Sequence, residues 1–266
     1  MQVTPVSSTI AVLDADARAA AARLVERLRA RVPRVHCITN SVAQAFTANV
    51  LLAAGVVPSM TIAAAEVGAM VGSADALLIN LGTLDAERRA AAEVAPAAAK
   101  ALARPWALDP VKVDRSPPRL AFAQGLLERG PALVRLNAGE FAALAGAAAS
   151  RVEVAAAARR WRCVVALTGE ADIVSDGTRT LTLHNGDALM TRVTAMGCAE
   201  TALAAAALAV EPDPWLAATA ALIVFGVAGE RAARSSHGPG SFAVTFLDEL
   251  HNLTPELIGA EARVTP

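Results

Sequence analysis

Tyrosine is absent from this chain, aromatic residues make up 3% of it, and the charges nearly cancel, with 24 Lys and Arg against 25 Asp and Glu. A β-sandwich needs bulky aromatic and branched faces, so this composition argues against one. Without a basic tract, the chain has no electrostatic reason to bind nucleic acid or an anionic membrane. We therefore expect neither as a partner.

A membrane span and a disulfide framework are also missing. The most apolar uncharged run, Trp215–Gly229, has 15 residues, fewer than the roughly 18–20 that a span needs. The three cysteines are an odd number, widely spaced and without a CxxC pair, which favours a reducing cytoplasm. Met1–Leu13 carries no positive charge before its apolar residues, unlike a secretory signal.

Common metal and nucleotide motifs are missing too. The four histidines have no i,i+4 or cysteine partners, so metal-ligand spacing is absent. No GxxxxGK[ST] loop occurs. Gly238-Pro239-Gly240 is first of all a turn, with Ser241 as a possible N-cap of the last helix. A nucleotide would have to bind without a P-loop.

What is present is an apolar, alanine-rich alternation of strand and helix patterns, with 55% hydrophobic residues. This alternation predicts an α/β fold with a mainly parallel central sheet and helices on both faces, in one domain covering residues 1–266. Around Asp176-Gly177, two short runs predict an antiparallel hairpin at the sheet edge. The expected strands are Val35–Thr39, Ala76–Leu81, Trp106–Val111, Ala132–Leu136 and Val164–Thr168, followed by the hairpin Ala171–Val174 and Thr178–His184. The expected helices are Ala17–Arg31, Val42–Ala54, Glu66–Val71, Asp85–Ala103, Arg119–Arg129, Ala138–Ala145, Val152–Arg160, Gly197–Val210, Trp215–Ala233 and Ser241–Leu253.

Polar residues follow most of the expected strands. Ligands in open α/β sheets bind beyond the carboxyl ends of the strands. The residues at these ends are Thr39, Asn40, Asn80, Gly82, Thr83, Asp109, Arg135, Asn137, Glu140, Thr168, Gly169 and Glu170. Any one of them could be only a helix cap, but five such loops together favour a binding site.

The segment Thr194–Cys198 leads directly into a helix. Backbone N–H groups at such a glycine-containing entry form a pocket for a phosphate or an oxyanion. The same field lowers a cysteine pKa, which would make the Cys198 thiolate a proton acceptor or a nucleophile. The alternative is that Cys198 is a small buried hydrophobic residue. We interpret Cys37 and Cys163 as structural residues of that kind.

Taken in order, several segments resemble the hydroxyethylthiazole kinases, thiamin-salvage enzymes of the ribokinase-like superfamily. The resemblance covers nearly the whole chain after residue 34. The matching segments are Ile38-Thr39-Asn40-Ser41-Val42, Thr47–Gly55, Pro58-Ser59-Met60, Asn80-Leu81-Gly82-Thr83-Leu84, Asp109-Pro110-Val111, Arg135–Glu140, Leu167–Glu170, Gly197-Cys198 and Gly238–Phe242. Each is weak alone, whereas their common order is specific.

The resemblance implies a ribokinase-like fold and transfer of the ATP γ-phosphate, with Mg²⁺, to the alcohol of 4-methyl-5-(2-hydroxyethyl)thiazole. It implies that Cys198 is the catalytic base, where most of the superfamily uses an aspartate. It also implies a homotrimer whose pockets lie between subunits. The other residues that it assigns are Arg135 and Thr168 to ATP, Asp109 and Glu140 to Mg²⁺ and the phosphates, Gly197 and Cys198 to the anion pocket, and Asn40, Val42, Met60, Gly82 and Ala195 to the thiazole.

Two segments depart from the family pattern. The family usually reads Thr-Gly-Thr-Gly-Cys where this chain has Ala195 and Met196 before Gly197. A glycine-rich loop after Asp109-Pro110-Val111 is replaced by the charged segment Lys112–Ser116. Two further hypotheses therefore stay open. The chain could phosphorylate another small alcohol, or it could bind nucleotide or thiazole without catalysis.

Overall fold

The computed structural model describes residues 6–266, and their side chains from Leu13 on. Part of Met1–Leu13, to which the expectation about a secretory signal refers, lies outside the described residues. One nine-stranded sheet has the order β2-β1-β3-β4-β5-β6-β7-β8-β9. The strands are β1 (Arg34–Ile38), β2 (Val57–Ser59), β3 (Ala76–Asn80), β4 (Trp106–Asp109), β5 (Leu133–Asn137), β6 (Val164–Thr168), β7 (Asp172–Ser175), β8 (Thr180–Leu183) and β9 (Val264–Thr265).

The strands from β2 to β6 are parallel, and β7, β8 and β9 add antiparallel partners at one edge. The predicted hairpin is therefore confirmed, and Gly177 takes φ +93° in its turn. Strand β2 is absent from the expected elements because its three residues include Pro58.

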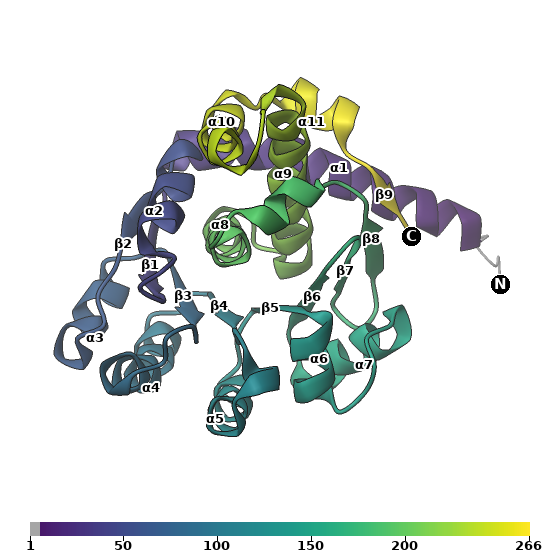
Figure 1. The fold of residues 1–266 in the computed structure, drawn as a ribbon. Helices are drawn as coiled ribbons and strands as arrows, with labels where there is room; N and C mark the ends of the chain where they lie inside the picture. Colours follow the sequence, from purple (N-terminus) through teal and green to yellow (C-terminus); the bar gives the residue numbers. More distant parts are fainter. Residues whose placement is uncertain (1–5) are drawn as a thin grey trace.

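Helices cover both faces of the sheet (Figure 1), as predicted. Helices α3 to α7 lie on one side, and α1, α2 and α8 to α11 lie on the other. The helices are α1 (Val6–Arg31), α2 (Gln44–Ala53), α3 (Ala64–Gly72), α4 (Ala86–Ala101), α5 (Pro117–Leu127), α6 (Ala138–Ala145), α7 (Arg151–Trp161), α8 (Met196–Val210), α9 (Pro214–Ser235), α10 (Pro239–Asn252) and α11 (Pro255–Glu261), with 3₁₀ turns η1 (Val113–Arg115) and η2 (Ala188–Arg192).

Alanine allows two of these helices to form the centre of the molecule. Residues 202–207 of α8 are buried against β1, β3 and β4, and α9 packs between α8, α1 and α10. Helix α9 is long and apolar enough to cross a membrane, yet 78% of its apolar window is buried inside the fold. The apolar residues of α9 therefore belong to the core of the fold.

The local sequence explains where the helices near the site begin. The Asn137 side chain accepts the Glu140 N–H and the Glu140 carboxylate accepts the Asn137 N–H, which forms a capping box at the start of α6. In α10, Pro239 occupies the first turn and Ser241 lies inside the helix, so the N-cap expected at Ser241 is wrong. The Ser241 hydroxyl instead accepts the His237 N–H.

Candidate active site

The polar strand ends predicted from the sequence do meet along one edge of the sheet. In the parallel register, Asn80 of β3 lies beside Asp109 of β4, and Asn137 of β5 lies beside Thr168 of β6. Because side chains at the carboxyl ends of parallel strands share one edge, the register alone brings these residues together.

A hydrogen-bonded chain of buried side chains runs along this edge. The Asn40 amide donates to Asn80 Oδ1 at 3.0 Å, and the Asn80 amide donates to Asp109 Oδ2 at 2.7 Å. Asn40 Nδ2 also donates to the Sγ of Cys198 at 3.4 Å. Gly82 makes the close approach possible, since a Cβ there would lie 2.7 Å from the Asn40 Cβ. The cysteine is thereby connected to Asp109 through two amides.

Asp109 is 1% exposed, and its second oxygen, Oδ1, has no hydrogen-bond partner within the described residues. Burial raises the pKa of Asp109 to about 7, against the opposing effect of the Arg135 charge. An unpaired buried carboxylate oxygen is costly unless a proton or a cation satisfies it. This oxygen is thus an available ligand at the bottom of the site.

The lowered pKa expected for Cys198 is wrong. Burial, followed by the nearby negative charge of Asp109, raises the pKa of Cys198 to about 11. The low pKa was expected from the helix field alone, without the effects of burial and of the Asp109 charge. Burial likewise raises the pKa values of Cys37 and Cys163 to about 12, in agreement with a structural role for these two cysteines.

Arg135 lies at the centre of the site as half of a buried ion pair. Its Nε and Nη2 atoms both lie 3.1 Å from Glu200 Oε2. A Cβ at Gly197 would lie 2.5 Å from Arg135 Nη1, so the guanidinium is packed against the entry of α8. Burial disfavours charge on either partner, but the surrounding carboxylates hold the pKa of Arg135 above its usual value. A fixed positive charge therefore lies beside the expected anion pocket.

The entry of α8 has the conformation that its family pattern would assign to glycine. Ala195 takes φ +71° and ψ 0°, and no side chain caps the helix. The first N–H groups of a helix have no partner within it. Those of α8 are therefore available to a phosphate.

A pocket of about 650 Å³, here termed the strand-end pocket, opens beside Arg135 and Thr168. Met196, Gly197 and Glu200 also line it. The structure thus brings the expected ATP residues and Gly197 into one hollow, whereas Cys198 does not line it.

The residues assigned to the thiazole are divided between two places. Asn40 and Gly82 lie in the buried chain beside Cys198. Val42 is 63% exposed, and Met60 is half-buried after β2; neither lines the strand-end pocket. In a single copy of the chain, Val42 and Met60 therefore lie at the margin of the site.

The acidic residues present suit Mg²⁺ in the manner of a kinase. Glu140 Oε1 accepts the Lys112 N–H at 2.8 Å and Oε2 accepts the Asn137 N–H at 3.0 Å, which holds this carboxylate in place. Among the described residues, no group of three or more His, Cys, Asp or Glu forms a closed metal cage. Mg²⁺ commonly uses one or two carboxylates together with substrate phosphates and water. Asp109, with its unpaired oxygen, and Glu140 fit that pattern.

Two parts of this site were not expected from the sequence. Glu200 is the sole charged residue in α8, and a charge in an otherwise apolar, buried helix is a usable signal for a functional or paired group. Asn185, which lines the strand-end pocket and donates to Glu230 of α9, follows the edge hairpin and gives no such signal.

Comparisons with known proteins match the family that the sequence resembles. The model of the hydroxyethylthiazole kinase family matches residues 25–256. A hydroxyethylthiazole kinase from Clavibacter sepedonicus is 45% identical over 257 residues, covering 92% of this chain and 94% of its own length. One from Granulibacter bethesdensis is 45% identical over 253 residues, covering 90% and 92%.

Solved structures agree as well. A hydroxyethylthiazole kinase protein from Pyrococcus horikoshii superposes with a TM-score of 0.88 at 39% identity, covering 92% of this chain and 97% of its own. A ribokinase-like superfamily protein from Enterococcus faecalis has a TM-score of 0.66 at 12% identity, with coverages of 84% and 88%. At that identity, the likeness to the Enterococcus protein shows the fold alone, which is ribokinase-like as expected.

Proposed function

This chain belongs to the hydroxyethylthiazole kinase family, and from that membership we propose that it phosphorylates the hydroxyethyl group of 4-methyl-5-(2-hydroxyethyl)thiazole with ATP, a step of thiamin salvage. The observation that carries the proposal is the meeting of Cys198, Arg135 and the open helix entry at one edge of the sheet. These are a group that can contact an alcohol, a fixed positive charge and phosphate donors.

ATP would lie in the strand-end pocket. Its phosphates would face the free N–H groups around Gly197 and the Arg135 guanidinium, while Thr168 would contact the nucleotide from the end of β6. Phosphoryl transfer depends mainly on positioning and on stabilising charge at the phosphoryl oxygens. The Glu200 carboxylate fixes the direction of the guanidinium, so Arg135 is pre-organised before ATP binds.

Asp109 and Glu140 would hold Mg²⁺. When bound, the metal supplies positive charge to the β- and γ-phosphate oxygens. The chain itself contributes two carboxylates held by Asn80 and by the backbone N–H groups of Lys112 and Asn137.

We assign the alcohol to the space beside Cys198. With a pKa raised to about 11 the thiol keeps its proton at neutral pH, so Cys198 can act as base only after its own proton has passed to solvent, which reaches this partly exposed side chain. The Asn40 N–H that points at the Sγ stabilises the deprotonated form. Because phosphoryl transfer has a loose transition state, removal of the alcohol proton can come late in the reaction.

Thiazole binding would use Asn40, Gly82 and Ala195 from one copy of the chain. A homotrimer would bring Val42 and Met60 into a shared pocket. Exposed apolar side chains on this part of the chain, at Val42 (63%), Leu52 (57%) and Val57 (43%), support such an interface.

We further propose that residues 1–266 form one kinase domain, because a single sheet runs through the described part of the chain. The three free cysteines, Cys37, Cys163 and Cys198, favour the cytoplasm as its compartment.

The direct test is ADP release coupled to a panel of small alcohols that includes the thiazole. We expect turnover with the thiazole above that with every other alcohol. Faster turnover of another alcohol would favour a kinase with a different substrate. Binding of ATP or thiazole without turnover would favour the non-catalytic alternative.

Cys198→Ala tests the assigned proton acceptor. It should lower kcat by about 10²–10⁴-fold, the usual contribution of a positioned base. Cys198→Asp should retain more activity, since a carboxylate can accept the same proton. Cys163→Ala is the matched control, because Cys163 is buried at the start of β6, away from the strand-end pocket. Full activity of Cys198→Ala would remove Cys198 from the mechanism.

A further inference from the structure

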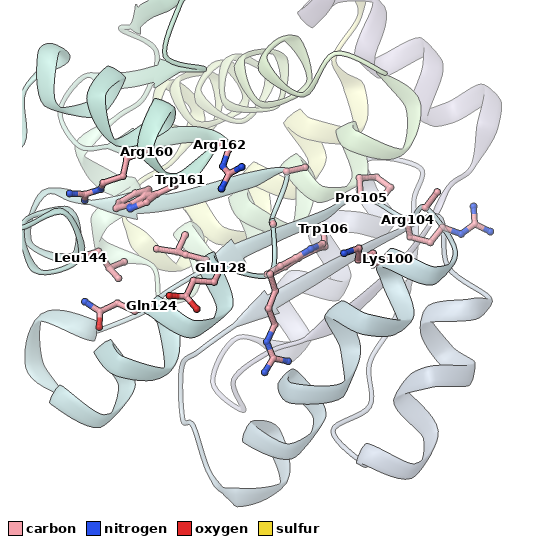
Figure 2. Close-up of a pocket in the computed structure, with 15 residues that line it drawn as sticks. Lys100, Arg104, Pro105, Trp106, Gln124, Glu128, Leu144, Arg160, Trp161 and Arg162 are labelled. Carbon is pink, nitrogen blue, oxygen red and sulfur yellow. The ribbon is translucent and has the colours of Figure 1, made fainter.

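A second and larger pocket, of about 1,060 Å³, lies at the amino-terminal ends of β4, β5 and β6, whereas the candidate active site lies at their carboxyl ends. Figure 2 shows this pocket. Trp106 starts β4 here, whereas Asp109, at the other end of the same strand, belongs to the active site. The charged side chains that line this pocket, here termed the basic pocket, are Lys100, Arg104, Arg129, Arg160, Arg162 and Glu128.

The basic pocket carries an excess of positive charge. Five cations line it against one carboxylate, and the nearest ion pair that any of the five makes, from residue 13 onward, is Arg104 to Asp75 at 3.9 Å. Arg129 donates one hydrogen bond to the backbone carbonyl of Glu93, and Arg160 donates one to that of Ala145. An arginine has five N–H donors, so most of the hydrogen-bonding capacity of these side chains is unused within the protein.

A structural explanation accounts for part of this charge. Helices α4, α5 and α7 all end at the basic pocket. Each helix C-terminus carries about half a negative charge, which nearby cations stabilise. Three such ends together carry a charge of about −1.5. This is smaller in magnitude than the net positive charge of the five cations and one carboxylate that line the pocket. Four of the five cations, Lys100, Arg129, Arg160 and Arg162, are exposed to solvent, so the remaining charge is accessible to an anion.

Aromatic surface lies among the cations. Trp161 is half-buried, and the Arg160 guanidinium lies 5.4 Å from the centre of its ring. Figure 2 shows Arg160 and Trp161 on one side of the pocket, Lys100 and Arg104 on the other, and Trp106 between them. The Arg104 Nε is buried and has no hydrogen-bond partner among the described residues. A planar ring beside Trp161 and a phosphate among the guanidinium groups would satisfy both kinds of surface.

We propose that the basic pocket is a second ligand site, which binds a small aromatic phosphate ester. The site shares no side chain with the strand-end pocket, so the proposal stands independently of the kinase assignment. The ligand needs both of its parts: the ester phosphate lies among the cations, which include Lys100 and Arg162, and the ring contacts Trp161.

The test is isothermal titration calorimetry of the full chain with phenyl phosphate, inorganic phosphate and phenol. Phenyl phosphate should bind at least fivefold more tightly than inorganic phosphate, and phenol should not bind measurably. Equal affinities for the two phosphates would overturn the aromatic part of the proposal. Absence of phenyl phosphate binding would overturn all of it.

Variants locate the binding. Lys100→Gln combined with Arg162→Asn should weaken phenyl phosphate binding at least tenfold, because two charge-assisted contacts are lost. Asparagine suits position 162, where φ is +55°. Unchanged thermal melting of this double variant, followed by circular dichroism, shows that the loss is not unfolding; if the double variant melts early, Lys100→Gln and Arg162→Asn are measured separately, and each should weaken binding at least about threefold.

Two controls separate the basic pocket from other anion sites. Arg23→Ala removes an exposed arginine of α1 and should leave the affinity unchanged if general surface charge is not responsible. Arg135→Ala alters the strand-end pocket and should also leave it unchanged. Loss of binding in Arg135→Ala with full binding in Lys100→Gln/Arg162→Asn would place the ligand in the strand-end pocket and refute the proposal.

Discussion

Ala195 has a left-handed backbone conformation that favours glycine, and replacing it by glycine should stabilise the protein. At φ +71° and ψ 0°, an L-residue other than glycine carries a cost of about 1–2 kcal/mol. Glycine removes that cost but makes the unfolded chain more disordered, which offsets about 0.4–1 kcal/mol. The expected net gain for Ala195→Gly is about 0.5–1 kcal/mol, which raises Tm by about 1–3 °C in a chain of this size.

Ala103 offers a matched control for this substitution. It is also an alanine at positive φ, +51°, but it follows α4 at the far edge of the sheet. Ala103→Gly should give a similar rise in Tm by scanning calorimetry and should leave thiazole phosphorylation unchanged. Ala195→Gly should instead raise kcat/KM for the thiazole as well, because a glycine lets the phosphate approach the backbone more closely.

Three results would refute this reasoning. A fall in Tm for Ala195→Gly together with a rise for Ala103→Gly would mean that the Ala195 methyl group contributes packing that exceeds its strain. A gain in stability with lower thiazole turnover would mean that Ala195 serves another substrate. No change in Tm for either variant would mean that positive φ costs little here. The neighbouring Met196→Thr is a poorer test because Met196 is 6% exposed and packs in the core, so truncating it creates a cavity.

Three further predictions concern the nucleotide, pH and assembly. Arg135→Ala should raise the KM for ATP at least about tenfold and the KM for the alcohol much less, since a charge-assisted contact to phosphate is lost; equal effects on both constants would count against the assignment, and Arg179→Ala, at the edge hairpin, is the control. Burial lowers the pKa of His36 from 6.5 to about 4, so the unfolded chain takes up the proton first and stability falls as pH drops from about 6.5 to about 4. Urea unfolding at about pH 7.5 and about pH 5 should show that the unsubstituted protein loses about 2 kcal/mol more on acidification than His36→Gln does, because buried carboxyls such as Asp109 contribute equally to both proteins; identical changes in both proteins would exclude the histidine. Light scattering at micromolar concentration should give a trimer that Val42→Asp dissociates, and a monomeric mass for the unsubstituted chain would remove the shared pocket.

The sequence was sufficient for the architecture because each long element has its own period and its own stop signal. The expected helices Val42–Ala54, Arg119–Arg129 and Ala138–Ala145 are each followed by a glycine, and these glycines, Gly55, Gly130 and Gly146, all take positive φ. The elements that were not predicted are short and obtain their stability from neighbours. Strand β9 has two residues and exists because it pairs with β8.

The sequence predicts those site residues that lie at the carboxyl ends of the parallel strands. A parallel sheet brings the carboxyl ends of its strands together, and Asn40, Asp109 and Arg135 all lie at or near such ends. The protonation state of Cys198 was not predictable, because the helix field is visible in the sequence whereas burial and the distance to Asp109 arise only in the fold. The partner of Arg135 was missed for a similar reason. Glu200 is 65 residues away along the chain, and no local pattern joins the two.

The strand order has a consequence for the way in which the chain folds as it is synthesised. Apart from the exchange of β1 and β2, each strand pairs with the strand that precedes it in sequence, so the sheet can grow by one strand at a time as the chain emerges from the ribosome. Helix α1 behaves differently, because it packs against α9 and α11 at the other end of the sequence. Until those helices have emerged, the apolar face of α1 has no final partner. Helix α1 is made before the helices that it packs against and is therefore among the last to dock, so a chaperone that holds nascent chains should contact α1 for longer than any strand of the sheet.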